Sequence, residues 1–218
     1  MKRSLVTLSL FALGAASFAQ TFQFQVTIEN LGPQPLSPLF WSAGNSSFDI
    51  FQLGGTSSAG IKAIAEGGNT APMMGIAGAA GADVFSFGTL PGGPLGPGGS
   101  NSGLFSTDNA HPFFSFAMML GKTNDGFLGE SFSTSNLSLF NQGTPEGFSM
   151  TITGLRAWDA GTEMNTQNAA DLGFLGGSGN PADANTAIRI HDSVTPGVGD
   201  SWAQMPDWDR GTPLARVT

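Results

Sequence analysis

Two carboxylates lie close together in a chain that has few charged residues. Asp159 and Glu163 follow Trp158, and Thr162 and Asn165 add a hydroxyl and an amide to the same stretch. Charged residues make up only 11% of the chain, so this concentration of oxygen donors is unusual. Carboxylate, hydroxyl and amide oxygens in one loop suit a hard cation such as calcium. A solvated loop tip is the alternative interpretation of the same residues.

The residues before these carboxylates have the pattern of a strand. Phe148, Met150 and Ile152 alternate with small polar residues, which is the period of a half-buried β-strand. We expect this strand to continue through Gly154 to Trp158. It would then place the oxygen donors at the exit of a rigid element.

Catalytic alternatives have weaker support. The two histidines, His111 and His191, have Ser115 and Ser193 nearby in sequence, but no G-x-S-x-G motif is present. Both histidines are interpreted as strand-end or surface residues. The glycine-rich residues 91–103 contain no lysine and match no phosphate-binding loop, and nothing indicates a sugar site around the carboxylates. We therefore expect no enzyme, with a secreted hydrolase as the alternative.

The N-terminus predicts export. A basic head, an apolar stretch, and small residues at the −3 and −1 positions (Ser17 and Ala19) form a signal peptide over residues 1–19, cleaved after Ala19. The apolar stretch is too short to span a membrane, so no transmembrane segment is expected. With Lys2 and Arg3 removed, six basic residues face 16 acidic ones, a net charge of −10. This acidity argues against nucleic acid as a partner. A secreted, periplasmic or cell-envelope protein is predicted.

The rest of the chain predicts a single all-β domain over residues 20–218. The chain has 32 glycines, 13 prolines and no cysteine, so turns are frequent and disulfides are excluded. One short helix is expected at 57–66, capped by Ser57 or Ser58 and ended by Gly67 and Gly68. Long Gly/Pro-rich loops are expected at 88–103 and 173–181. Strands are expected at 22–29, 36–41 (on a sheet edge), 82–87, 112–120 (in a sheet centre), 127–129, 136–140, 148–158 and 187–191.

Several short motifs, in order, resemble the spondin domain, the N-terminal module of certain extracellular matrix proteins. They cover nearly the whole chain after the signal peptide. The matching stretches are Val26-Thr27-Ile28-Glu29-Asn30-Leu31, Gln34-Pro35-Leu36-Ser37-Pro38, Gly60-Ile61 with Ala65-Glu66, residues 115–119, Thr123-Asn124-Asp125-Gly126-Phe127, Trp158-Asp159-Ala160-Gly161-Thr162-Glu163, and Trp208 with residues 213–218.

The resemblance implies an antiparallel eight-stranded β-sandwich similar to calcium- and lipid-binding sandwich domains. It also implies a calcium ion among the loops at one end, with Asp125, Asp159 and Glu163 as metal ligands. Asn124, Thr162 and Asn165 are further oxygen donors. The expected function is a calcium-binding adhesion or cell-envelope module whose partner is an extracellular or cell-surface protein or glycan. A structural envelope subunit without metal is the other alternative.

Overall fold

The computed structural model describes residues 20–166, 168–172, 177, 181–191 and 210–218. The predicted signal peptide and most of the predicted loop at 173–181 lie outside the described residues, as do Ser193 and Trp208. No helix of the described part is both long and apolar enough to cross a membrane.

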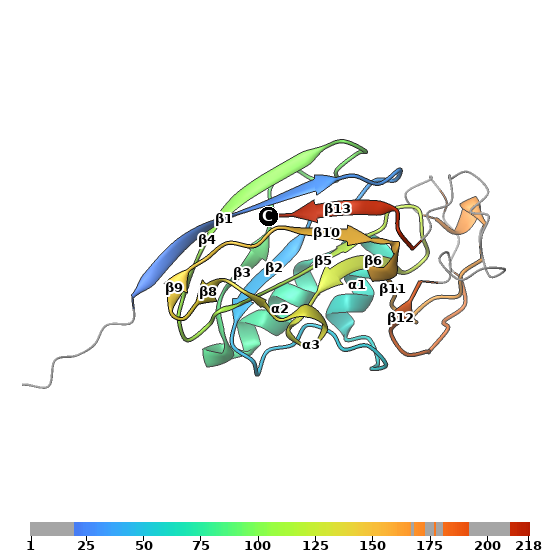
Figure 1. Ribbon diagram of the computed structural model, residues 1–218. Helices are drawn as coiled ribbons and strands as arrows, with labels where there is room; N and C mark the ends of the chain where they lie inside the picture. Colours follow the sequence, from blue (N-terminus) through green and yellow to red (C-terminus); the bar gives the residue numbers. More distant parts are fainter. Residues whose placement is uncertain (1–19, 167, 173–176, 178–180, 192–209) are drawn as a thin grey trace, which may run out of the picture.

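Antiparallel strands form two main sheets (Figure 1). The four-stranded sheet has the order β10-β13-β1-β4, and its strands are β1 (Thr21–Asn30), β4 (Ser100–Asp108), β10 (Met150–Thr153) and β13 (Pro213–Val217). The seven-stranded sheet has the order β12-β11-β6-β5-β2-β3, with β7 also paired to β5. Its strands are β2 (Phe40–Gly44), β3 (Val84–Thr89), β5 (Phe113–Met119), β6 (Gly126–Glu130), β7 (Leu137–Ser138), β11 (Ala157–Asp159) and β12 (Arg189–Ile190).

A small hairpin of β8 (Phe140–Asn141) and β9 (Thr144–Pro145) completes the strands. The predicted all-β antiparallel sandwich is confirmed. The described strands are more numerous than the eight expected, because β4, β8, β9 and β13 were not expected and the strand expected at 148–158 is divided into β10 and β11. Each of β8 and β9 has only two residues, which is too short to show an alternation from which it could be predicted.

The helices are short. They are α1 (Ala59–Gly67), α2 (Ala71–Ala79) and α3 (Phe132–Ser135), with 3-10 turns η1 (Gly81–Asp83), η2 (Gly154–Arg156) and η3 (Ala169–Asp171). The prediction of α1 is confirmed, since the Ser58 side chain accepts a hydrogen bond from the Ile61 N–H and Gly68 ends the helix at φ +64°. The helix α2 was not predicted, because apolar residues and two glycines on all its sides hide the helical period.

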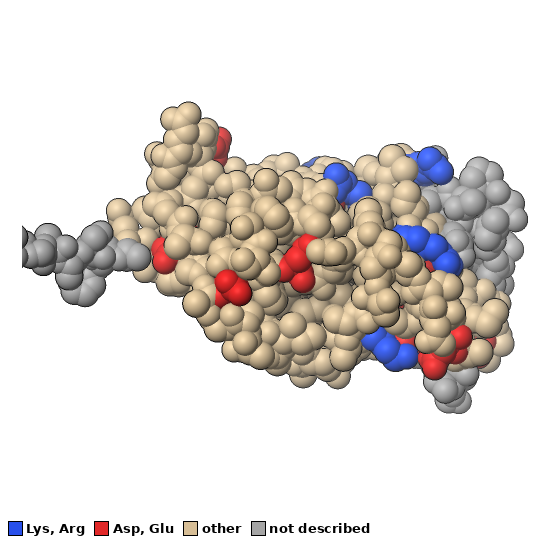
Figure 2. Space-filling model, turned by 90° about the horizontal axis from the view of Figure 1, so that it is seen from below, with Lys and Arg blue, Asp and Glu red and all other residues tan. Residues whose placement is uncertain are grey.

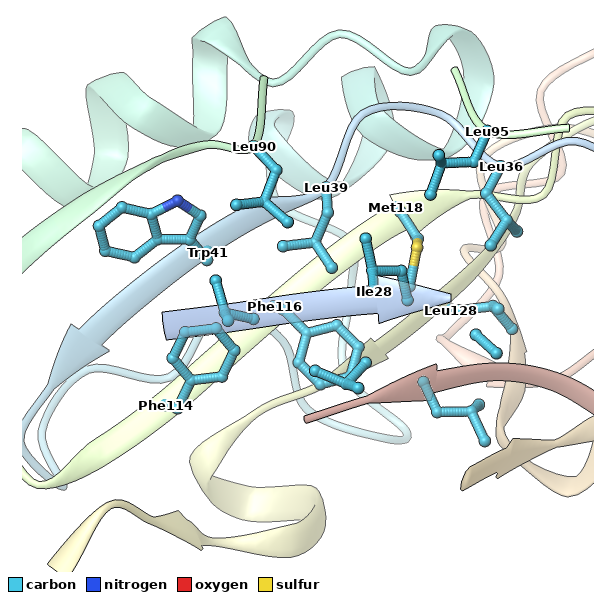
Figure 3. Close-up of a cluster of buried hydrophobic side chains, with 14 of the residues drawn as sticks. Ile28, Leu36, Leu39, Trp41, Leu90, Leu95, Phe114, Phe116, Met118 and Leu128 are labelled. Carbon is cyan, nitrogen blue, oxygen red and sulfur yellow. The ribbon is translucent and has the colours of Figure 1, made fainter. Parts of the chain in front are cut away.

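The core has two parts, one on each face of the seven-stranded sheet. Side chains of both sheets fill the first part, shown in Figure 3. Side chains of α1, α2 and the outer sheet face fill the second. The central strand β5 contributes to both parts, with Phe114, Phe116 and Met118 on one face and Ala117 on the other. This confirms the expected central strand. Full burial of such large side chains stabilises the fold by about 1.5–3 kcal/mol each.

The prediction of one strand over 148–158 is wrong, because this stretch forms two separate strands. The chain leaves the four-stranded sheet after Thr153, turns through η2, and enters the seven-stranded sheet as β11. The buried Gly154 begins this turn. Alternation of side chains is a local property, so it does not reveal that one apolar run serves two sheets in succession.

Two further expectations need correction. The second strand is β2, and it lies between β3 and β5 rather than on an edge, because Pro35 and Pro38 precede the strand instead of interrupting it. The loop expected at 88–103 is shorter, because β3 extends to Thr89 and β4 begins at Ser100. Within the loop, Leu95 forms a bridge with Leu36.

Candidate metal centre

Sheet pairing brings the three sequence-predicted ligands into one region. Asp125 directly precedes β6, and Asp159 is the last residue of β11. These strands are antiparallel neighbours in which Asp159 lies opposite Gly126, and the Ala160 N–H donates to the Asp125 carbonyl oxygen at 3.1 Å. Glu163 follows four residues after Asp159. The predicted convergence of the two loops is therefore present at the end of the molecule that carries β11 and β12 (Figure 1).

Asp125 joins the two loops and keeps one carboxylate oxygen without a partner. Its Oδ2 accepts hydrogen bonds from the backbone N–H of Thr162 at 2.7 Å and of Glu163 at 3.0 Å, and the Thr162 hydroxyl lies 3.3 Å away. Its Oδ1 has no hydrogen-bond partner, although the side chain is fully buried. A buried, unsatisfied carboxylate oxygen is costly unless something else binds it.

Asp159 is also fully buried, but both its oxygens are occupied. Oδ1 accepts from the Gly161 N–H at 2.7 Å, and Oδ2 accepts from Asn165 Nδ2 at 2.8 Å and from the Arg189 guanidinium at 3.0 Å. Arg189 therefore balances the charge of Asp159. The reach of Arg189 from the neighbouring strand was not anticipated from the sequence.

Gly161 allows the loop to close over these groups. It has φ +70°, and a Cβ added there would lie 2.3 Å from the carbonyl oxygen of Thr186. Backbone bonds between Gly161 and Thr186 and between Thr162 and Ala184 pair the loop with residues 184–186. The loop after β11 is therefore pinned on both sides, by Asp125 and by residues 184–186.

Burial and charge raise the pKa of Asp125 to about 6. Removal of the carboxylate from water is the largest cause, and the nearby charge of Asp159 adds to it. The hydrogen bonds from Glu163 and Thr162 favour the charged form but do not compensate. At neutral pH Asp125 therefore carries a negative charge that the surrounding protein groups only partly stabilise.

Glu163 lies in a second group of charges that extends toward α1. Burial is the largest cause that raises its pKa to about 7, followed by the charges of Glu66 and Asp125, while Lys62 acts in the opposite direction. Lys62 forms ion pairs with Glu66 at 3.1 Å and with Asp183 at 3.3 Å. On the face shown in Figure 2, basic side chains gather toward this end of the molecule, some of them beside acidic ones.

The further oxygen donors are only partly available. Asn124 is buried, its Oδ1 accepts from the Thr166 N–H at 3.2 Å, and its Nδ2 has no partner. Thr162 and Asn165 are engaged with Asp125 and Asp159 respectively. Among the described residues, no three His, Asp or Glu side chains are arranged as a ready metal-ligand group. The geometry is thus two adjacent buried carboxylates with one open oxygen.

The hydrogen bonds described for the two histidines involve no serine. Both ring nitrogens of His111 are within hydrogen-bond distance of other groups, Asp108 Oδ1 at 2.6 Å and the Ala82 carbonyl oxygen at 2.8 Å. His191 is fully buried, and its backbone N–H donates to Ala157. Of the aromatic residues that the structure describes, Phe85 is exposed, with 39% of its surface accessible, and the others are half-buried or buried.

Comparison with known protein families finds the family that the sequence motifs resemble. The family model described as Spondin_N matches residues 27–170, which include Asp125, Asp159 and Glu163. No curated protein matches the chain.

Proposed function

Because this chain belongs to the spondin N-terminal domain family, we propose that it is a non-enzymatic, exported module that binds calcium at one end. Membership of this family suggests an extracellular-matrix or adhesion type of module. The proposed partner is an extracellular or cell-surface protein or glycan. The ion would fix the loops after β5 and β11, so that a surface for this partner is ordered before binding.

The open oxygen of Asp125 carries the calcium proposal. This oxygen is buried, lies beside a second carboxylate, and has no hydrogen-bond donor. A divalent cation would satisfy the oxygen and offset the repulsion between Asp125 and Asp159. Calcium is favoured over magnesium because it tolerates irregular sets of six to eight oxygens, including backbone carbonyls and water.

The residues present fit a calcium site built mainly on Asp125 and Glu163. Asp125 would supply its open oxygen, and Glu163 would supply a carboxylate that repels Asp125 in the absence of a cation. Asp159 would contribute through its charge, since its oxygens are held by Gly161, Asn165 and Arg189. Carbonyl oxygens of the loops and water would complete the coordination.

Binding of this ion would act on loop order. Asp125 already holds Thr162 and Glu163 through their backbone N–H groups. A cation shared by Asp125 and Glu163 would add a second connection between the same two loops. The loop end of the sandwich would then lose conformational freedom before it meets a partner, which reduces the entropy cost of association.

Thermal unfolding of residues 20–218, the chain without the predicted signal peptide (the mature chain), tests the calcium proposal. A ligand at 100 times its dissociation constant stabilises the native state by about 2.7 kcal/mol, which corresponds to a rise of about 5–10 °C in Tm for a domain of this size. We expect such a rise between chelator and millimolar calcium at pH 7.5. The double variant Asp125→Ala, Asp159→Ala should lose the rise.

The exposed Glu146→Gln variant is the matched control, because it removes one carboxylate from the β8–β9 region and should keep the full response. An unchanged melting curve of the wild-type chain across millimolar calcium would contradict the proposed site. Retention of the full response by the double variant would place the ligands elsewhere.

A further inference from the structure

His111 lies in the turn between β4 and β5, at the end of the sandwich opposite the proposed calcium site (Figure 1). The last residue of β4, Asp108, pairs with Thr21 at the beginning of β1. Across the turn, the His111 ring reaches the backbone of η1, which leads directly into β3. His111 therefore connects β4, an edge strand of the four-stranded sheet, to η1, which precedes β3, an edge strand of the seven-stranded sheet.

Both hydrogen-bond partners of the His111 ring are acceptors. The Ala82 carbonyl oxygen, 2.8 Å from Nε2, has no hydrogen to donate. Asp108 Oδ1, 2.6 Å from Nδ1, also accepts from the backbone N–H groups of Ala110 and His111. Both ring nitrogens must therefore donate if both bonds are to form, which requires the charged imidazolium form.

The charges around the ring favour this form. Burial lowers the pKa of His111, but the bonds to Ala82 and Asp108 and the charges of Asp108 and Asp83 together raise it above its ordinary value of 6.5. Asp108 from β4 and Asp83 from η1 are the charged groups that act on the ring among the described residues. The ring of Phe85 from β3 contacts the His111 ring, with the two ring centroids 5.6 Å apart.

We propose that the two hydrogen bonds of the His111 ring form a pH-dependent link, here called the clasp, between the β4–β5 turn and η1. The clasp connects the two sheets at one corner of the sandwich. In the charged form both bonds are made, and loss of the proton removes one of them. The Ser86 hydroxyl bond to the Ser106 carbonyl joins β3 to β4 nearby and does not depend on pH. The corner is thus held more tightly in mildly acidic than in alkaline surroundings.

The sign of the pH effect follows from the raised pKa. The folded chain holds the His111 proton more strongly than the unfolded chain, whose histidine titrates near 6.5. The clasp therefore contributes its full stability below pH 6.5 and loses it as the pH rises through the folded pKa.

Proton NMR titration of the mature chain tests the charged state of the ring. His111 and His191 give separate ring signals, assigned by the loss of one of them in His111→Gln. We expect His111 to titrate above 6.5.

The variant Asp108→Asn should lower the pKa of His111. If this variant does not fold, Asp83→Asn should lower the pKa of His111 by a smaller amount. Glu29→Gln, which removes an exposed carboxylate paired with Arg216, should leave the titration unchanged. A His111 pKa at or below 6.5 in the wild-type chain would overturn the proposal.

Hydrogen exchange measured by mass spectrometry tests the clasp itself. A peptide over residues 80–86 should lose about tenfold in protection, after correction for intrinsic exchange rates, when the pH is raised through the His111 pKa. His111→Gln should show the lower protection at both pH values, and a peptide over α1 should not change in either protein. Equal pH dependence of residues 80–86 in the wild type and His111→Gln would overturn the clasp.

Discussion

Replacement of Asp125 by asparagine should stabilise the chain when calcium is absent. Asparagine keeps a carbonyl oxygen that can accept from the N–H groups of Thr162 and Glu163, and it removes the negative charge beside Asp159. The rise of the Asp125 pKa from 3.8 to about 6 means that the native state resists ionisation at this position. At roughly 1.4 kcal/mol per pKa unit, ionisation of Asp125 costs the native state about 3 kcal/mol at pH 8.

The stability gained by Asp125→Asn should be smaller than this cost of ionisation, because the buried amide group of asparagine also needs a hydrogen-bond partner. We expect about 1–3 kcal/mol from urea unfolding of the mature chain in chelator at pH 8. Asp125 binds more protons in the native than in the unfolded state between pH 4 and 6, so wild-type stability falls as the pH rises through this range. The advantage of Asp125→Asn should therefore vanish near pH 4.

At pH 8, saturating calcium should make the wild-type chain more stable than Asp125→Asn. The wild-type chain should gain the stabilisation of a bound ion, whereas Asp125→Asn should gain little. If Asp125→Asn is instead less stable than the wild type in chelator at pH 8, the Asp125 charge is a net stabilising feature of the fold and the expected gain is wrong.

Two further substitutions test how the loop after β11 is held. Arg189→Met should destabilise the chain by about 1–3 kcal/mol in urea unfolding, because it leaves the buried Asp159 carboxylate without its cation; unchanged stability would show that the ion pair contributes little. Gly161→Ala should cost about 2 kcal/mol or more and weaken the calcium response, because its Cβ would meet the Thr186 carbonyl oxygen at 2.3 Å and its φ is +70°. An alanine variant with wild-type Tm and calcium response would contradict the close contact.

Local patterns predicted the elements whose burial follows a regular period. The apolar faces of β5 and the caps of α1 can be read from a few adjacent residues, and both are confirmed. The strand β4 was missed because its first four residues, Ser100 to Gly103, are small and polar or glycine. Its place in the sheet is determined by pairing with β1, and such long-range pairing leaves no local signal.

The candidate site was predicted in its position but not in its electrostatics. The two loops that carry Asp125 and Asp159 do meet, because β6 and β11 are neighbours. The sequence does not indicate that Arg189, 30 residues after Asp159, forms an ion pair with the Asp159 carboxylate. Nor does it indicate that Glu163 faces the charges of Glu66 and Asp183. These contacts depend on the tertiary fold, so they become visible only once the strands are placed.

Isothermal titration of calcium into the chelator-treated mature chain at pH 7.5 measures the proposed ion site itself. We expect one calcium site per chain in the wild type and in Glu146→Gln, and loss of that site in Asp125→Asn. Absence of binding to the wild-type chain at millimolar calcium, or equal binding to Asp125→Asn, would contradict this expectation.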